Sequence, residues 1–201
     1  MRIVVATLVL ILITNFAKAE ESHRDHEALR ALLQGATAAV NQQQFDNLSQ
    51  FFHPRLRVTT VNQDSIIKPN ALEPFFRSWV GEEQYVHQMN MSMEADELTE
   101  FYGQGESRFG IARGQGTEEY SLADGRQLEL KTRWTATVTK DDGGNWKILA
   151  LHIGTNFYRN PIVAELQSSL KSYALIALIV GLSVGLILGF LIWGRRNRKG
   201  S

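Results

Sequence analysis

The stretch LELKTRWTATVTKDDGGNWKILALHI, Leu128–Ile153, decides the fold class. Its first part, Leu128–Val138, alternates apolar with polar side chains, which is the period of a strand with one buried face. The segment Asp141–Asn145 is rich in Asp, Gly and Asn and predicts a tight turn. The apolar run Trp146–Ile153 predicts a second strand. We therefore expect an antiparallel hairpin that closes a sheet.

The expected strand Trp146–Ile153 is apolar on both faces. One face should cover the helices of the domain. The other needs a cover of its own, for which a second copy of the chain is the simplest source. The candidate dimer-interface residues on that second face are Leu149, Leu151 and Ile153.

Upstream of the sheet, apolar residues recur with a period close to four. This spacing predicts a first helix over Ser22–Gln43 and a short second helix over Phe45–Phe52. A third helix should open at Pro69 and carry Trp79 on its inner face. Two short strands are expected between the second and third helices, at Leu56–Val61 and Ser65–Lys68.

After Gly81 the period changes to two, which predicts further strands. The first of them should turn one methionine-rich face inward, with His87, Met89, Met91, Met93 and Ala95. The next strands are expected at Leu98–Tyr102, Arg108–Ala112 and Thr117–Leu122. Glycines at 103, 105, 114 and 116 separate these strands, and we expect bulges there in a strongly bent sheet.

Three helices around a small hairpin, followed by a long bent antiparallel sheet, make an α+β cone. Together with Thr132-Arg-Trp-Thr-Ala-Thr137 and the closing segment Asp141–His152, this order resembles the nuclear-transport-factor-two-like superfamily. Its SnoaL-like branch includes polyketide cyclases and ketosteroid isomerase. The resemblance covers residues 22–160 and implies a pocket between the sheet and the helices, often with sheet-to-sheet dimers. It implies functions from catalysis to ligand-free association, and the fold does not choose among them.

The N-terminus predicts a secretory signal peptide. Arg2 precedes an apolar run, Ile3–Ile13, and the small residues Ala17 and Ala19 stand before Glu20. As a helix the run is about 16 Å long, too short for a hydrocarbon core of about 30 Å. We expect cleavage after Ala19, with an uncleaved anchor or a buried helix as the alternative.

The C-terminus predicts a membrane-spanning helix. No residue between Ser172 and Gly194 is charged, and a helix over Tyr173–Trp193 is about 31 Å long. Four cations follow, from Arg195 to Lys199, and positive residues stay on the cytoplasmic side. We expect a single-pass protein with a cytoplasmic C-terminus. Its N-terminal domain should lie outside, in the periplasm if the source is a Gram-negative bacterium.

Small residues recur at every fourth position of the expected span, which would let a second helix approach closely. The alternative is that these residues have no role in helix contact, because glycine is common in membrane helices. The candidate contact residues between two copies are Gly181, Gly185 and Gly189.

The composition excludes several classes of protein. The 201 residues include no cysteine, which excludes disulfides, thiolate metal sites and a cysteine nucleophile. The 21 basic residues only match the 21 acidic ones, which argues against nucleic-acid binding. His23 and His26 lie one helical turn apart but lack a third ligand, so no metal site is expected. The glycines match neither a dinucleotide fingerprint nor a P-loop, and no cofactor is expected.

The candidate site is the pocket that the resemblance implies. His87 is a weak candidate for a general base; the alternative is a rim histidine hydrogen-bonded to the backbone. The remaining candidates could equally be plain core residues. The candidate pocket-lining residues are Trp79, His87, Met89, Met91, Tyr102 and Trp134.

Three functions remain open. The first is a non-enzymatic, membrane-anchored domain that binds a small apolar ligand or a partner protein. The second is an isomerase, dehydratase or cyclase on a hydrophobic substrate, which requires a cavity of about 300 Å³ or more that contains His87. The third is a structural dimerisation module. The expected domains are a signal peptide at 1–19, the cone at 20–160, a helical stalk at 161–172, the membrane span at 173–193 and a basic cytoplasmic tail at 194–201.

Overall fold

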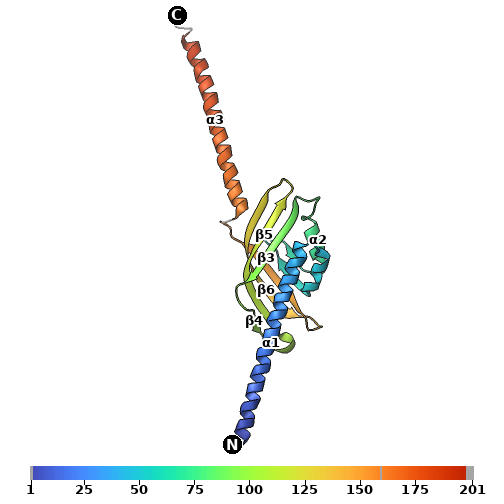
Figure 1. Ribbon diagram of the computed structural model, residues 1–201. Coiled ribbons are helices and arrows are strands. Elements are labelled where there is room, and N and C mark those ends of the chain that lie inside the picture. Colours follow the sequence, from blue (N-terminus) through green and yellow to red (C-terminus); the bar gives the residue numbers. More distant parts are fainter. Residues whose placement is uncertain (1, 159, 198–201) are drawn as a thin grey trace. The chain divides into compact units, whose positions relative to one another are not determined.

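The computed structural model describes residues 2–158 and 160–197. The chain forms two compact units, Met1–Asn156 and Phe157–Ser201. The first unit contains the sheet and the helices that pack on it, and the second consists mainly of one long helix, α3 (Figure 1).

The first unit is built on one curved sheet whose strand order is β2-β1-β7-β6-β5-β3, with β4 paired to β5. Neighbouring strands are antiparallel except β1 and β7, which are parallel. The strands are β1 (Phe52–Thr59), β2 (Ser65–Ile66), β3 (Val86–Ala95), β4 (Glu100–Tyr102), β5 (Phe109–Leu122), β6 (Gln127–Lys140) and β7 (Trp146–Thr155). The helices are α1 (Arg2–Asn41), the 3-10 turns η1 (Phe45–Phe51), η2 (Pro69–Ala71) and η3 (Gly105–Ser107), and α2 (Leu72–Arg77).

The predicted order of elements is present, with shifted boundaries. Helix α1 has no boundary at Ser22, because residues 17–21 are Ala, Lys, Ala, Glu and Glu, all good helix formers. The predicted second helix is the 3-10 turn η1, and β1 begins directly after it at Phe52 rather than at Leu56.

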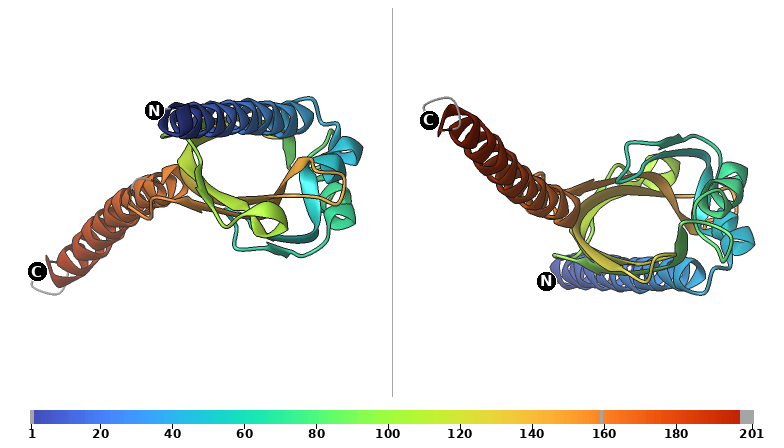
Figure 2. Two further views of the ribbon diagram at one scale, coloured as in Figure 1. Left: turned by 90° about the horizontal axis from the view of Figure 1, so that it is seen from below. Right: turned by 90° about the horizontal axis from the view of Figure 1, so that it is seen from above.

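Helix α1 covers the concave side of the sheet. In Figure 2 the strands curve into an arc whose open side is closed by α1. Ala39 and Val40 of α1 pack into a core with residues of η1, β1, α2 and β3, and in this core Leu48 and Leu56 are 1% and 0% exposed. The arrangement is an α+β cone with its core between the helices and the inner face of the sheet.

The absence of a side chain at Gly114 allows Trp134 to pack closely against the neighbouring strand. A Cβ on Gly114 would stand 2.0 Å from the Glu94 carbonyl oxygen and 2.4 Å from the Trp134 ring. The Trp134 indole Nε1 donates a hydrogen bond to the Gln115 carbonyl oxygen at 3.0 Å. The expected bulges at Gly114 and Gly116 are wrong, because β5 keeps its register with both neighbours there.

A one-residue bulge in β7 changes which of its side chains face inward. Val138 pairs with Ile148 while Thr137 pairs with Ala150, so Leu149 has no partner on β6. An extra residue switches the alternation of a strand to the opposite face. Leu151 and Ile153 consequently join Ile148 on the concave side, and Ile153 is 9% exposed. The prediction that Leu151 and Ile153 form an outer dimer interface is therefore wrong, and Leu149 is the half-buried bulge residue.

The outer face of the sheet is polar rather than apolar. Its exposed residues on β5 and β6 include Arg113, Glu119, Lys131 and Arg133. Arg113 is ion-paired with Glu97, and Arg133 with Asp96. The described part of this face thus offers no continuous apolar patch of the kind that the sequence led us to expect.

A buried acid fixes α1 to the sheet. Asp25 is 6% exposed, and its carboxylate accepts hydrogen bonds from Trp146 Nε1 at 2.8 Å and Arg108 Nη1 at 2.5 Å. Lys140 Nζ lies 3.2 Å away. Burial alone would raise the pKa of Asp25, but the bonds from Trp146 and Lys140, together with the Arg108 charge, hold the pKa below its ordinary value. This carboxylate is fully compensated, and its role is structural.

The second unit contains an apolar helix of membrane-spanning length. Helix α3 runs over Pro161–Asn197, and its apolar segment, Val163–Gly189, has a mean hydropathy of 2.2. This segment begins before the predicted span and overlaps residues 163–172 of the predicted stalk. The candidate contact glycines have open space around them. Residues 198–201 of the predicted tail lie outside the described residues.

Candidate binding cavity

A cavity of about 190 Å³ lies between α1, α2 and the concave face of the sheet. Its walls come from α1, the turn between β1 and β2, α2 and the residues after it, and the inward faces of β3 and β5–β7. Nearly all of the lining is apolar side chain. An occupant would therefore meet hydrocarbon and aromatic surface on most sides.

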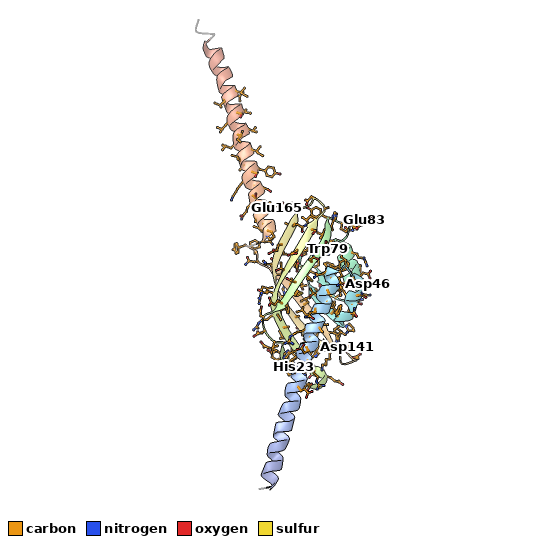
Figure 3. All side chains as sticks on the ribbon, in the orientation of Figure 1. His23, Asp46, Trp79, Glu83, Asp141 and Glu165 are labelled. Atoms are coloured by element: carbon orange, nitrogen blue, oxygen red, sulfur yellow. The ribbon has the colours of Figure 1, made fainter. Side chains whose placement is uncertain are left out.

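Four of the six predicted lining residues are part of this wall. Met89 and Met91 face inward from β3, Trp134 faces inward from β6, and Trp79 follows α2. Met89 and Trp134 are each 4% exposed. Figure 3 marks Trp79 where the segment after α2 meets the sheet. Regular alternation in β3 and β6 is what places the two methionines and Trp134 on one side.

His87 lies outside the cavity. The register between β3 and β5 shifts between Val86 and Gln88, which leaves His87 without a partner and with an exposed side chain. Its carbonyl oxygen accepts a hydrogen bond from Gln43 Nε2 at 3.2 Å. The prediction that His87 lines the pocket is wrong, because a bulge again breaks the alternation on which it rested.

Tyr102 also lies outside the cavity. It is 43% exposed, its hydroxyl donates to the Glu100 carboxylate at 2.6 Å, and its ring stacks on Phe109. Its neighbour Phe101 instead turns toward the domain and packs on His26 and Trp146. The prediction that Tyr102 lines the pocket is therefore wrong, and Phe101 is the residue of β4 that packs inward.

The main polar feature of the cavity is a carboxyl group that the sequence analysis did not single out. Glu118 of β5 lines the cavity and is 2% exposed. The Tyr120 hydroxyl donates a hydrogen bond to its carboxylate. Burial raises the pKa of the Glu118 carboxyl, and the bond from Tyr120 only partly opposes this. Burial, with the nearby Glu118 charge, also raises the pKa of Tyr120. In the part of the chain that the structure describes, Glu118 has no ion-pair partner.

Aromatic rings surround this end of the cavity. The Trp79 and Tyr120 ring centroids are 6.1 Å apart, and Phe75 and Phe76 each lie 6.0 Å from Trp79. All four rings line the cavity together with Glu118. Trp79 Nε1 and the Thr37 hydroxyl are buried with no hydrogen-bond partner among the described residues.

The sequence contains a signal for Glu118. In Gly114-Gln-Gly-Thr-Glu-Glu-Tyr120, alternate positions place Glu118 on the same face as both glycines and Tyr120. A carboxyl in phase with inward-facing residues is a candidate for a buried acid. Expecting bulges at the glycines broke this stretch into two strands and hid the phase.

Metal coordination has no evident site among the residues described. No three side chains of His, Cys, Asp or Glu gather within ligand distance in that part of the chain. His26, one of the two histidines one turn apart, packs its ring on Phe101 at 5.0 Å.

Solved structures share this architecture. A protein named as a scytalone dehydratase from Novosphingobium aromaticivorans matches with a TM-score of 0.56 and 13% identity, over 69% of this chain and 89% of that chain. A hexachlorocyclohexane dehydrochlorinase from Novosphingobium barchaimii matches with a TM-score of 0.53 and 12% identity, over 67% and 88%. A ketosteroid isomerase-like protein from Erwinia carotovora atroseptica gives 0.53 and 12%, over 65% and 95%.

The domain has the nuclear-transport-factor-two-like fold. The predicted fold class is thereby confirmed. Neighbours with this fold include proteins named as a dehydratase and a dehydrochlorinase, so the fold is compatible with catalysis. At these identities the likeness shows the fold alone. A scan against protein-family models and a search of curated proteins gave no match.

Proposed function

We propose that this chain is a membrane-anchored domain that binds a small, mainly apolar ligand in the cavity beneath α1. The cavity itself supports the proposal most strongly. Protein cores pack densely, and an apolar void forfeits dispersion contacts on all of its walls. A void of about 190 Å³ among Met89, Met91 and Trp134 is large by that standard and indicates an occupant.

The volume limits the size of the ligand. An apolar cavity of about 150 Å³ accommodates benzene. The cavity here, about 190 Å³, suits one ring with a short substituent or an aliphatic molecule of similar bulk. It is smaller than the cavity of about 300 Å³ expected for the enzyme hypothesis.

The proposed location follows from the two ends of the chain. Helix α3 supplies an apolar segment, Val163–Gly189, that is long enough to cross a bilayer. The cations at Arg195 and Arg196 favour a cytoplasmic C-terminus. The predicted signal peptide with cleavage after Ala19 favours export of the cone, and protease accessibility of the cone in sealed cells is the direct test.

Methionine-methyl NMR tests the ligand proposal, because Met89, Met91 and Met93 are three of only four methionines and all line the cavity. Ethylbenzene added to the full chain in nanodiscs should shift their methyl signals saturably. Ala136→Phe, which adds a ring to the lining, should abolish the shifts. Thr135→Phe, on the outer face of the same strand, is the matched control and should keep them.

Two results would contradict the proposal. The first is the absence of any saturable shift in the wild-type chain. The second is an unchanged response after the cavity is filled. If Ala136→Phe does not fold, the milder Ala112→Leu replaces it, since Ala112 lies directly opposite Ala136 and also lines the cavity.

A proton-transfer enzyme is a second candidate because of one observation. Glu118 is a buried carboxyl whose pKa is raised, the condition in which a carboxyl serves as an acid or base near neutral pH. His87 cannot serve in this role from its exposed position. Turnover of an isomerisable or dehydratable ligand that is lost in Glu118→Gln would favour the enzyme over the binding module.

Self-association remains a proposal that rests on α3. The row Gly181, Gly185 and Gly189 would allow close helix contact in a membrane. Gly185→Leu should convert dimers in nanodiscs or detergent to monomers by light scattering, whereas Leu186→Val on another face should not. A monomeric wild-type chain at high concentration would exclude pairing.

A further inference from the structure

The domain contains two buried acids with opposite surroundings. Asp25 is paired with Arg108 and Lys140. Glu118 is more deeply buried, at 2% exposure, yet its described partner is only the Tyr120 hydroxyl. A buried carboxyl without a cation either stays protonated or awaits a positive charge from outside.

The rings around Glu118 are those that favour a cation. Ammonium groups are attracted to the faces of Trp, Tyr and Phe, and most strongly when water is excluded. Trp79 and Tyr120 are within ring contact of each other, with Phe75 and Phe76 packed on Trp79. The combination of one acid and several ring faces is a recognised environment for an organic ammonium group.

We infer that the cavity takes a small organic ammonium ion with an apolar body, whose head lies beside Glu118 and the rings of Trp79 and Tyr120. This inference rests on the proposed ligand-binding function and names the class of ligand. Glu118 supplies the counter-charge, and the methionines and Trp134 contact the apolar body.

A neutral ligand with a carbonyl acceptor is the main competitor. It would need free donors, and Trp79 Nε1 and the Thr37 hydroxyl have no hydrogen-bond partner in the part of the chain that the structure describes. Both atoms, however, are covered by surrounding atoms and do not face open space. Glu118, by contrast, is a buried acid with no ion-pair partner among the described residues, which favours a cationic ligand.

Binding of the ammonium ion is coupled to the loss of one proton from Glu118. At a pH where the Glu118 carboxyl of the free domain is neutral, it releases its proton to water on binding, and the carboxylate pairs with the ammonium group that enters. Ammonium affinity should therefore rise with pH until Glu118 is ionised in the free domain. The other titratable or charged groups in the lining are His26, Arg30, Glu97 and Tyr120. None of His26, Arg30 or Glu97 contributes to the pKa of Glu118, and Tyr120 keeps its proton.

The test compares benzylamine with ethylbenzene, which has the same number of heavy atoms but no charge. Both are titrated, by free aqueous concentration, into the full chain in nanodiscs and followed by the methionine methyl signals. Benzylammonium should bind at least about tenfold more tightly than ethylbenzene near pH 8, and its affinity should rise with pH until Glu118 is ionised in the free domain. Glu118→Gln should remove this preference and its pH dependence, so that the variant no longer binds benzylamine more tightly than ethylbenzene. Glu119→Gln, on the exposed face of the same strand, should change neither.

Each result has one meaning. Ethylbenzene binding without a preference for benzylamine overturns the inference and leaves the proposed function standing. A preference for benzylamine that survives in Glu118→Gln also overturns it. So does tighter binding of acetophenone, the probe for a neutral ligand with a carbonyl acceptor, than of benzylamine. Failure of all three probes overturns the proposed function together with the inference.

Discussion

Glu118→Gln should alter how the stability of the domain depends on pH. In the unfolded chain this carboxyl titrates near its ordinary value of 4.5, and in the folded domain burial raises its pKa. Between these two values the folded domain holds one proton more than the unfolded chain. The free energy of unfolding therefore falls as pH rises through this window, by about 1.4 kcal/mol per pH unit for one proton. Glutamine cannot ionise, so the variant should lack this decline.

The measured quantity is the difference between the unfolding free energies of the variant and the wild-type chain. Urea unfolding of the full chain in detergent, followed by tryptophan fluorescence, gives both values at each pH. From about pH 4.5 upward, the unfolding free energy of the variant should increase relative to that of the wild-type chain. The difference should become constant once Glu118 ionises in the folded state. Glu119→Gln is the exposed control. A difference that stays flat or falls between pH 4.5 and 8 would refute the assignment of a buried, uncompensated acid.

Two further substitutions test the packing and the charge network. Gly114→Ala should destabilise the domain by about 3 kcal/mol, because its Cβ would overlap the Glu94 carbonyl and Trp134. Gly154→Ala, with open space around it, is the control and should cost far less. Equal urea midpoints for the two variants would contradict this close packing. Asp25→Asn should also cost about 3 kcal/mol near pH 7, since two cations lose their buried counter-charge. Because the pKa of Asp25 is lowered by folding, its stabilisation should be lost as pH falls below about 3.8, and a cost independent of pH would argue against the ion pair.

The regular parts of the sheet could be predicted from the sequence. Strand β6 alternates without interruption, so Trp134 falls on the inner face as expected. Met89 and Met91 follow the same rule in β3. The order of helices and strands was also sufficient to indicate the nuclear-transport-factor-two-like cone, because that order leaves few ways to bury the apolar faces.

The failures at the site have a common physical cause. Each of β3 and β7 contains one extra residue, His87 and Leu149 respectively. The bulge in β3 turns His87 itself outward, and the bulge in β7 moves the residues after Leu149 to the other face of the sheet. A bulge depends on how the two paired strands match in length and twist, which the pattern within one strand does not contain. Leu151 and Ile153 were therefore assigned to the wrong face.

Glu118 was missed for a different reason. Its neighbour Glu119 is exposed, and a pair of acids in a strand usually indicates a solvated edge. Only an uninterrupted β5 also puts Glu118 in phase with the inward-facing Gly114 and Gly116. The signal peptide, membrane orientation and pairing of copies stay predictions, which the experiments proposed above address.

Xenon binding tests the central claim, an apolar cavity inside the cone, most directly. Xenon enters dry apolar cavities of about 150 Å³ without needing any particular chemical group. Diffraction from crystals under xenon pressure should show one well-occupied atom beneath α1, within contact distance of Met89, Met91 and Trp134, and none in Ala136→Phe. The same space filled by side chains or by ordered water in the wild-type crystal would contradict the account.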